Sequence, residues 1–158
     1  MSTIEKKSVS VGKYADKKLV DRFISRYKQE RWAQNSERIG REDALSGWYT
    51  LEELEEFIQN VKMQGGDGIR LYFGVFPEGY QNNKEIAGRQ TAVFVGTRSS
   101  DGSYASSKDL FIRDGKENKV LAYLGGQPCP SYCGPVPPGG QSLGLTMIDK
   151  GDNGISVI

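Results

Sequence analysis

Apolar side chains between residues 15 and 34 recur every three to four positions, which is the repeat of an α-helix with one buried side. The buried side would carry Leu19, Val20, Phe23, Ile24 and Tyr27. Lysines and arginines cover most of the remaining positions. The pattern therefore predicts an amphipathic first helix, followed by a polar connector in which Gly40 and Gly47 interrupt helical structure.

A second helix is predicted from residue 50 onward, and its start carries a specific signal. Thr50 is a good N-cap and Glu53 follows three residues later, which together make a capping box. The apolar stripe of this helix consists of Leu54, Phe57, Ile58 and Val61. A glycine-rich run follows, and it predicts that the helix ends with Gly65 as its left-handed cap.

From residue 68 the apolar period becomes two, which is the repeat of a β-strand. The segment "GIRLYFGVF" has an apolar row that we expect to face the core, made of Ile69, Leu71, Phe73 and Val75. Arg70 and Tyr72 then share the opposite face. A second strand is predicted over residues 89–98, and "LFIR" and "KVLAYL" predict a shorter hairpin around "DGKEN".

Two helices followed by several strands indicate an α+β fold. We expect the two N-terminal helices to pack on one face of a four- to five-stranded, mainly antiparallel sheet. The length of 158 residues suits a single domain, residues 1–158. Within it we expect residues 1–14 to be flexible, residues 99–108 to form a mobile Ser-rich loop, and the Pro/Gly-rich C-terminal segment, residues 125–158, to be mostly irregular.

Composition excludes several kinds of chemistry. The chain has no histidine, which excludes Ser-His-Asp and Cys-His catalysis and histidine zinc sites. An enzyme built from this chain would use carboxylates, lysine, tyrosine, cysteine or an oxygen-bound metal. No residue pattern predicts a cofactor or a metal ion, so we expect none of either.

Charge and hydropathy also limit the partners. The formal net charge is +1, so nothing global attracts the chain to nucleic acid or to an anionic membrane. No apolar run approaches the ~20 residues of a membrane helix, and the N-terminus lacks the apolar core of a signal peptide. We therefore expect a cytoplasmic protein with neither a nucleic-acid nor a membrane partner.

Both cysteines of the chain, Cys129 and Cys133, lie in the segment "GGQPCPSYCGPVPPGG". Three residues separate them, whereas a thioredoxin-like redox centre has two and a helix at the first cysteine. A zinc site needs about four ligands. We therefore predict a stiff turn in which a disulfide between the two cysteines is geometrically easy, and we keep a redox or metal role as the alternative.

The face of the first strand that carries Arg70 and Tyr72 is the best candidate binding surface. An antiparallel second strand would bring Arg89 or Arg98 nearby. Arginines beside aromatic side chains suit a carboxylate, a phosphate or a peptide terminus. The alternative is an arginine–glutamate pair on a half-solvated sheet, which any amphipathic sheet can hold. The ligand-binding candidates are Arg70, Tyr72, Trp48 and Arg98.

The stretch from Trp48 to Arg98 contains "GWYTLEELEEFI", "GGDGIRLYFGVFPE" and "TAVFVGTR". In these motifs it resembles an uncharacterised family of short bacterial α+β proteins, over about a third of the chain. The best matched residues are Trp48, Leu54, Gly68, Ile69, Arg70, Tyr72 and Gly74. The resemblance implies no activity, and it implies that the helix and the two strands form one module.

These observations favour a cytoplasmic binding or interaction module for a small anionic ligand or a protein segment. A histidine-free enzyme that uses carboxylate or Tyr/Arg chemistry is the second hypothesis. The third is a self-associating structural subunit, for example a homodimer formed through an exposed sheet edge or the proline-rich tail.

Overall fold

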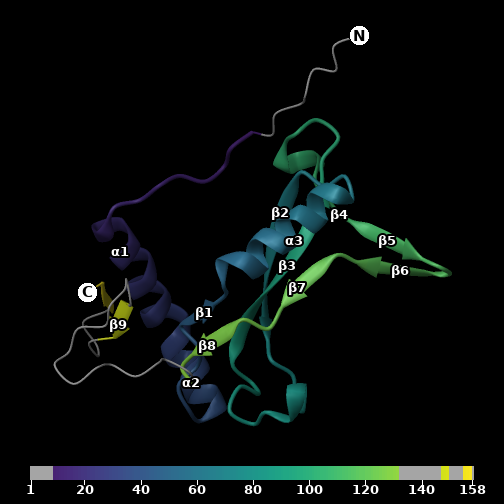
Figure 1. Cartoon of the computed structure of the whole chain (residues 1–158). Helices are drawn as coiled ribbons and strands as arrows, with labels where there is room; N and C mark the ends of the chain where they lie inside the picture. The colour runs from purple at the N-terminus through teal and green to yellow at the C-terminus, as the bar shows by residue number, and fades with distance from the viewer. Residues whose placement is uncertain (1–8, 132–146, 150–154, 158) are drawn as a thin grey trace. The chain divides into compact units, whose positions relative to one another are not determined.

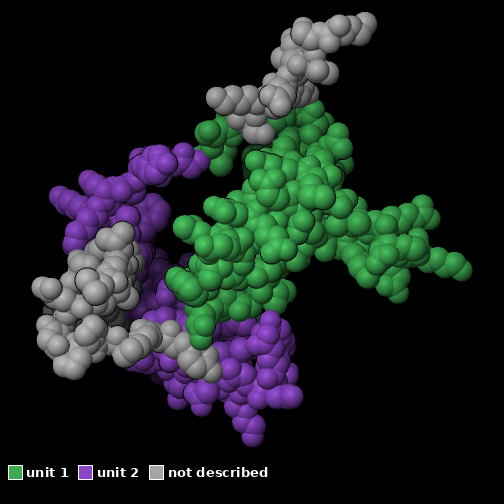
Figure 2. All heavy atoms as spheres, in the orientation of Figure 1, with its two compact units in different colours: residues 1–11, 47–75, 91–127 green, residues 12–46, 76–90, 128–158 purple. Residues whose placement is uncertain are grey.

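The structure, a computed structural model, describes residues 9–131, 147–149 and 155–157. The fold is α+β with antiparallel strand pairs. The chain divides into two compact units (Figure 2). Unit 1 consists of residues 1–11, 47–75 and 91–127, and unit 2 consists of residues 12–46, 76–90 and 128–158. The expectation that residues 1–158 act as a single domain stays a prediction.

Unit 2 begins with a continuous helical stretch (Figure 1). Its parts are α1 (Lys17–Tyr27), the π-helical η1 (Lys28–Trp32) and α2 (Ala33–Ile39). The stretch begins where Asp16 accepts a hydrogen bond from the Leu19 backbone N–H, at 2.8 Å. It ends at Gly40, whose φ of 73° is left-handed. The predicted first helix therefore continues beyond residue 34, and Gly40 ends it.

The rest of unit 2 contains a small apolar core. Its buried apolar residues are Ala44, Phe76, Ile86 and Ala87. The connection over residues 76–90 includes the short 3₁₀ helix η2 (Tyr80–Asn82). The strands β9 (Met147–Asp149) and β10 (Ile155–Val157) pair antiparallel. Most of the tail that we expect to be irregular lies outside the described residues.

Unit 1 contains α3 (Leu51–Met63), whose start confirms the predicted capping box. Thr50 Oγ1 accepts a hydrogen bond from the Glu53 N–H at 3.1 Å, and Glu53 Oε2 accepts one from the Thr50 N–H at 2.6 Å. Gly65 follows the helix with a left-handed φ of 81°, as predicted. Local hydrogen bonds and one glycine therefore set both ends of α3.

The main sheet has the strand order β2-β3-β4 among the described strands, and β7 also pairs with β3. Its strands are β2 (Gly68–Val75), β3 (Gln90–Arg98), β4 (Lys108–Asp109) and β7 (Ala122–Leu124). β4 and β7 pair antiparallel with successive parts of β3. β2 runs antiparallel along the other side of β3, because Gly68 lies beside Thr97 and Gly74 lies beside Thr91. Among the described strands β2 is therefore an edge strand.

Two smaller strand pairs accompany the main sheet. β1 (Ser46–Trp48) pairs with β8 (Gln127–Cys129). β5 (Phe111–Asp114) and β6 (Glu117–Val120) form a hairpin that extends away from the main sheet (Figure 1). This confirms the predicted hairpin around "DGKEN". The prediction that "KVLAYL" is one strand is wrong, because residues 122–124 form β7 and pair with β3 instead.

α3 packs against β3 and β7 through Phe57 and Val61, which are 4% and 3% exposed. The Phe57 ring lies 5.8 Å from the ring of Tyr123 in β7. Val61 lies so close to Gly96 of β3 that a Cβ on Gly96 would come within 2.9 Å of it. Glycine at this position therefore allows the helix to approach the sheet closely.

The apolar row of β2 points to the α3 side of the sheet. Gly68 and Thr97 are neighbours on one face of the sheet. Their adjacent residues Ile69 and Gly96 therefore lie on the opposite face, which is the α3 side because Gly96 contacts Val61. The four side chains of the row are nevertheless exposed: Ile69 by 42%, Leu71 by 45%, Phe73 by 80% and Val75 by 62%. The expectation that this row faces the core is therefore wrong, because α3 packs on β3 and β7 while β2 lies at the edge.

Candidate functional site

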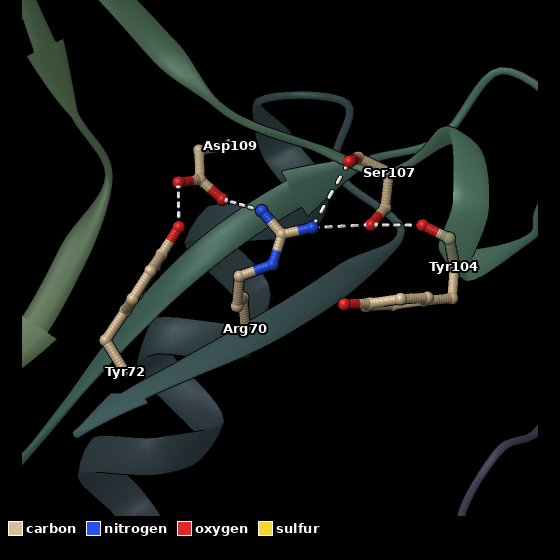
Figure 3. Close-up of polar contacts among 5 residues, drawn as sticks. All are labelled: Arg70, Tyr72, Tyr104, Ser107 and Asp109. Carbon is tan, nitrogen blue, oxygen red and sulfur yellow. Dashed lines mark hydrogen bonds and ion pairs between the residues drawn. The ribbon is translucent and has the colours of Figure 1, made fainter.

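Arg70 is the centre of a polar cluster on the face of the main sheet opposite α3 (Figure 3). Its Nη1 lies 2.5 Å from Oδ1 of Asp109. Its Nη2 donates to the hydroxyl and the backbone oxygen of Ser107, at 2.8 Å and 3.2 Å. The Tyr72 hydroxyl donates to the second carboxylate oxygen of Asp109 at 2.6 Å. Two strands and a loop thus meet at one guanidinium and one carboxylate.

Strand register places this cluster. Arg70 and Tyr72 are two residues apart in β2 and share a face. Asp109 of β4 is paired with Thr97 of β3, which points to the same face. Because β3 lies between β2 and β4, the ion pair between Arg70 and Asp109 spans β3. Val95 and Thr97, the β3 residues on this face, are each 4% exposed.

The surroundings of Arg70 keep it charged and paired. The Tyr72 hydroxyl is the main cause that raises the pKa of the Arg70 guanidinium, burial opposes this rise, and the carboxylate of Asp109 adds to it. The side chains of Arg70 and Asp109 are 27% and 24% exposed. A ligand anion that approached Arg70 would therefore compete with a carboxylate already bound to it.

A groove of about 330 Å³ opens beside Arg70 within unit 1. Its walls include the apolar side chains of Val9, Val11 and Ile69 and the polar side chains of Arg70, Ser103 and Tyr104. The volume is close to the lower limit of about 300 Å³ for small-molecule sites. Tyr104 is 77% exposed, so this wall projects into solvent.

The Ser-rich loop at residues 99–108 has its own hydrogen bonds. Asp101 Oδ1 accepts from the backbone N–H and the hydroxyl of Ser103, at 2.9 Å and 2.6 Å, and from the hydroxyl of Ser106. These hydrogen bonds, with that of the Ser103 hydroxyl the strongest, hold the pKa of Asp101 well below its usual range. The mobility that we expect for this loop stays a prediction.

The four predicted ligand-binding residues occupy three different places. Arg70 and Tyr72 lie together in the cluster on Asp109. Arg98, which follows Thr97 in β3, projects to the α3 side, and its Nη1 lies 3.4 Å from where a Cβ on Gly65 would be. Trp48 lies in β1 and is 65% exposed. A ligand-binding role for these residues stays a prediction.

Sequence reasoning missed the partners of Arg70. Asp109 lies 39 residues from Arg70 and Ser107 lies 37 residues from it. β4 is only two residues long, so no alternation of apolar and polar residues reveals which face Asp109 takes. The expected alternative of an arginine–glutamate pair was correct in chemical type, since an aspartate fills that place.

The cysteine segment is described only in part. Cys129 ends β8 and is disulfide-bonded. Its backbone oxygen accepts a hydrogen bond from the Leu45 N–H at 2.7 Å. Cys133 lies outside the described residues, so the predicted bridge between Cys129 and Cys133 stays a prediction.

A second polar cluster, in unit 2, surrounds Arg89, which is 6% exposed. Arg89 Nε donates to the backbone oxygen of Glu85 at 2.7 Å, and Nη1 donates to the backbone oxygen of Glu42. Burial is the main cause that lowers the pKa of Arg89, and the nearby charge of Arg41 adds to it. Arg89 therefore joins two backbone segments from a buried position.

Asp43 completes this buried cluster and is 3% exposed. Its Oδ1 accepts hydrogen bonds from the N–H groups of Ala44 and Gln90, at 2.8 Å and 2.7 Å. Its backbone oxygen accepts from Nε1 of Trp32 at 2.7 Å. These bonds connect the helical stretch, the segment after it and the start of β3, which is a structural role.

Neither a metal site, nor a membrane-spanning helix, nor a known relative identifies a function for the described residues. Within residues 9–131, no group of three or more His, Cys, Asp or Glu side chains is placed to hold a metal ion. No helix in the described part of the chain has the length and apolar character needed to cross a membrane. Comparisons with models of protein families, with curated proteins and with solved structures find no match.

Proposed function

We propose that this protein is an interaction module that binds an extended protein segment as an added strand beside β2. The supporting observation is the exposed apolar row of this edge strand, Ile69, Leu71, Phe73 and Val75. An edge strand offers backbone N–H and C=O groups to an incoming strand, and its side chains select which segments fit. This row favours a segment with apolar residues at every second position.

The usual protection of an edge strand is weak in β2. Natural edges carry charged side chains, prolines or bulges that prevent pairing with another chain. β2 has one charged residue, Arg70, and its side chain crosses β3 to reach Asp109. Pro77 lies beyond the end of the strand. These features support a role for the edge in binding.

A small anionic ligand at Arg70 is the alternative occupant. The groove beside Arg70 favours it, but Asp109 already neutralises the guanidinium. A histidine-free enzyme is supported less, because the nearby carboxylates are engaged in holding the structure together. Asp67 accepts from Ser99 at 3.0 Å, and Asp109 accepts from Arg70 and Tyr72. We therefore favour binding over catalysis.

We also propose the location and the detailed architecture that the sequence predicts. The module would act in the bacterial cytoplasm, with both N-terminal helices packed on one face of a four- to five-stranded sheet. The proposal includes no nucleic-acid partner and no cofactor. It also includes the homodimer as one form that the interaction can take.

Peptide selection tests the proposal. A display library of random twelve-residue peptides would be selected against the full chain, and the enriched peptides would be measured by fluorescence anisotropy. We expect apolar residues at alternate positions in the enriched peptides. We expect Phe73→Lys to weaken their binding by roughly tenfold or more, because Phe73 is 80% exposed in the row and a lysine there would be desolvated by the added strand.

Phe111→Lys is the matched control, since Phe111 is a strand phenylalanine that is 64% exposed in β5, outside the main sheet. It should leave peptide binding unchanged. Circular dichroism would confirm that both variants keep the fold. Peptides without alternation, or peptides that bind Phe73→Lys as well as they bind the wild-type chain, would overturn the proposal.

A further inference from the structure

The apolar row of β2 is complementary to itself. We infer that the segment that adds to β2 is β2 of a second copy of this chain, an inference that rests on the proposed function. In an antiparallel pair with a two-fold axis perpendicular to the sheet, directly opposed residues lie on the same face. The axis passes midway between the two copies of one residue, which are opposite each other. With Leu71 on the axis, Leu71 meets Leu71 and Ile69 meets Phe73 of the other copy.

The same register suits the polar face of the strand. Arg70 comes opposite Tyr72 of the second copy, and the face of an aromatic ring is a favourable neighbour for a guanidinium. Asp109 lies 2.5 Å from Arg70, so the two copies bring together neutral ion pairs instead of two bare cations. Gly68 comes opposite Gly74, which leaves the two ends of the paired region free of side-chain crowding.

The size of the contact sets its expected strength. Each copy contributes seven residues of β2, residues 68–74, with the exposed side chains of Ile69, Leu71 and Phe73. A contact of this kind buries less than the ~1,600 Å² of a typical stable interface. We therefore expect a dissociation constant of roughly 1–100 µM, with a reversible exchange between monomer and dimer.

The β5–β6 hairpin also carries exposed apolar residues, and it is less suited to this role. Phe111 and Val120 are 64% and 44% exposed, but they face each other across the hairpin and form one pair instead of a row. Five of the eight residues between Phe111 and Val120 are charged, namely Arg113, Asp114, Lys116, Glu117 and Lys119. These charges protect its edges, as charges on natural edge strands do.

Sedimentation velocity of the full chain between about 1 and 200 µM tests the inference. We expect the weight-average sedimentation coefficient to rise with concentration from that of a monomer toward that of a dimer. Leu71→Lys should hold the chain as a monomer over the whole range, because the two-fold axis brings both new lysines together. Phe111→Lys should dimerise as the wild-type chain does.

Cysteine cross-linking tests the register. Leu71→Cys places two thiols opposite each other on the axis, within the Cα separation of about 4.4–6.8 Å that a disulfide needs. It should give a covalent dimer under mild oxidation. Ile69→Cys should not, because Ile69 is opposite Phe73 and the two new thiols are four residues apart along the strands. The wild-type chain gives the background from its two native cysteines.

The outcomes separate this inference from the proposed function. A chain that stays monomeric at 200 µM but binds selected peptides through Phe73 overturns the second copy as occupant and leaves strand addition standing. A dimer that survives Leu71→Lys, or one that cross-links at Ile69→Cys instead of Leu71→Cys, also overturns it. A monomer that binds no peptide overturns both.

Discussion

Two arginines, Arg70 in unit 1 and Arg89 in unit 2, are held in opposite ways. Arg70 is 27% exposed, and its closest partner is the carboxylate of Asp109. Arg89 is 6% exposed and donates to the backbone oxygens of Glu42 and Glu85. Both residues are arginines on or next to a strand, yet Arg70 has a charged partner near solvent and Arg89 has neutral hydrogen-bond partners in a buried site.

The difference predicts how much each arginine contributes to the stability of the fold. If Arg70 is lost, water can solvate Asp109, so the cost to folding is small. If Arg89 is lost, two backbone oxygens lose their donor in a site that water enters poorly, so the cost is large. Arg89 is therefore a structural residue of unit 2, and Arg70 is a residue of the sheet face that can change with little harm to the fold.

The largest expected effect is that of Arg89→Met, which keeps the apolar stem and removes the donors. We expect the free energy of unfolding to fall by about 3 kcal/mol and Tm to fall by roughly 6–12 °C. Differential scanning calorimetry would measure both. Arg38→Met, at an exposed position of α2, is the control and should change Tm little. Equal losses in the two variants would contradict the structural role of Arg89.

A smaller effect is expected for the pair of Arg70 and Asp109. Arg70→Met should lower Tm by well under half of the Arg89→Met loss, because the pair is partly exposed. A double-mutant cycle with Asp109→Asn should give a coupling that decreases between about 0.05 and 1 M NaCl, since salt screens the pair. The Arg89→Met loss should depend less on salt, because the direct partners of Arg89 are uncharged backbone oxygens in a buried site. Equal salt dependence at both sites would remove the contrast between them.

The smallest expected effect on stability is that of Glu53. Like Arg89, this charged side chain has a backbone group as a partner, since it accepts a hydrogen bond from the Thr50 N–H. The Thr50 backbone N–H is the main cause that lowers the pKa of Glu53, and the Tyr123 hydroxyl adds to it. A lowered pKa in the folded state means that Glu53 stabilises the fold at pH values above the usual glutamate pKa. This stabilisation is lost as pH falls through the lowered pKa.

Urea unfolding midpoints at several pH values would measure this effect. Glu53→Gln should unfold more easily than the wild-type chain at pH 7, and the difference should shrink between about pH 5 and pH 3. Glu55→Gln, at an exposed position of the same helix, should show no such trend. A difference between Glu53→Gln and the wild-type chain that stays constant with pH would show that the carboxylate charge is not what stabilises the cap.

Features set by neighbours in the chain could be predicted from the sequence. The capping box of Thr50 and Glu53, the left-handed Gly65, and the shared face of Arg70 and Tyr72 all depend on residues within a few positions. Features set by distant contacts could not be predicted. Sequence reasoning paired Arg70 with no particular residue, although it proposed an acidic partner of the right kind.

The sequence by itself determined the α+β class, the ends of α3 and the alternation along β2, because capping and side-chain period act over one or two turns of chain. Only the tertiary structure decided which strand β7 pairs with, that Asp109 is the partner of Arg70, and that the apolar row of β2 is exposed. Those features depend on which strand lies at the edge of the sheet and on which strands α3 packs against. Local periodicity is the same for a buried row and an exposed one.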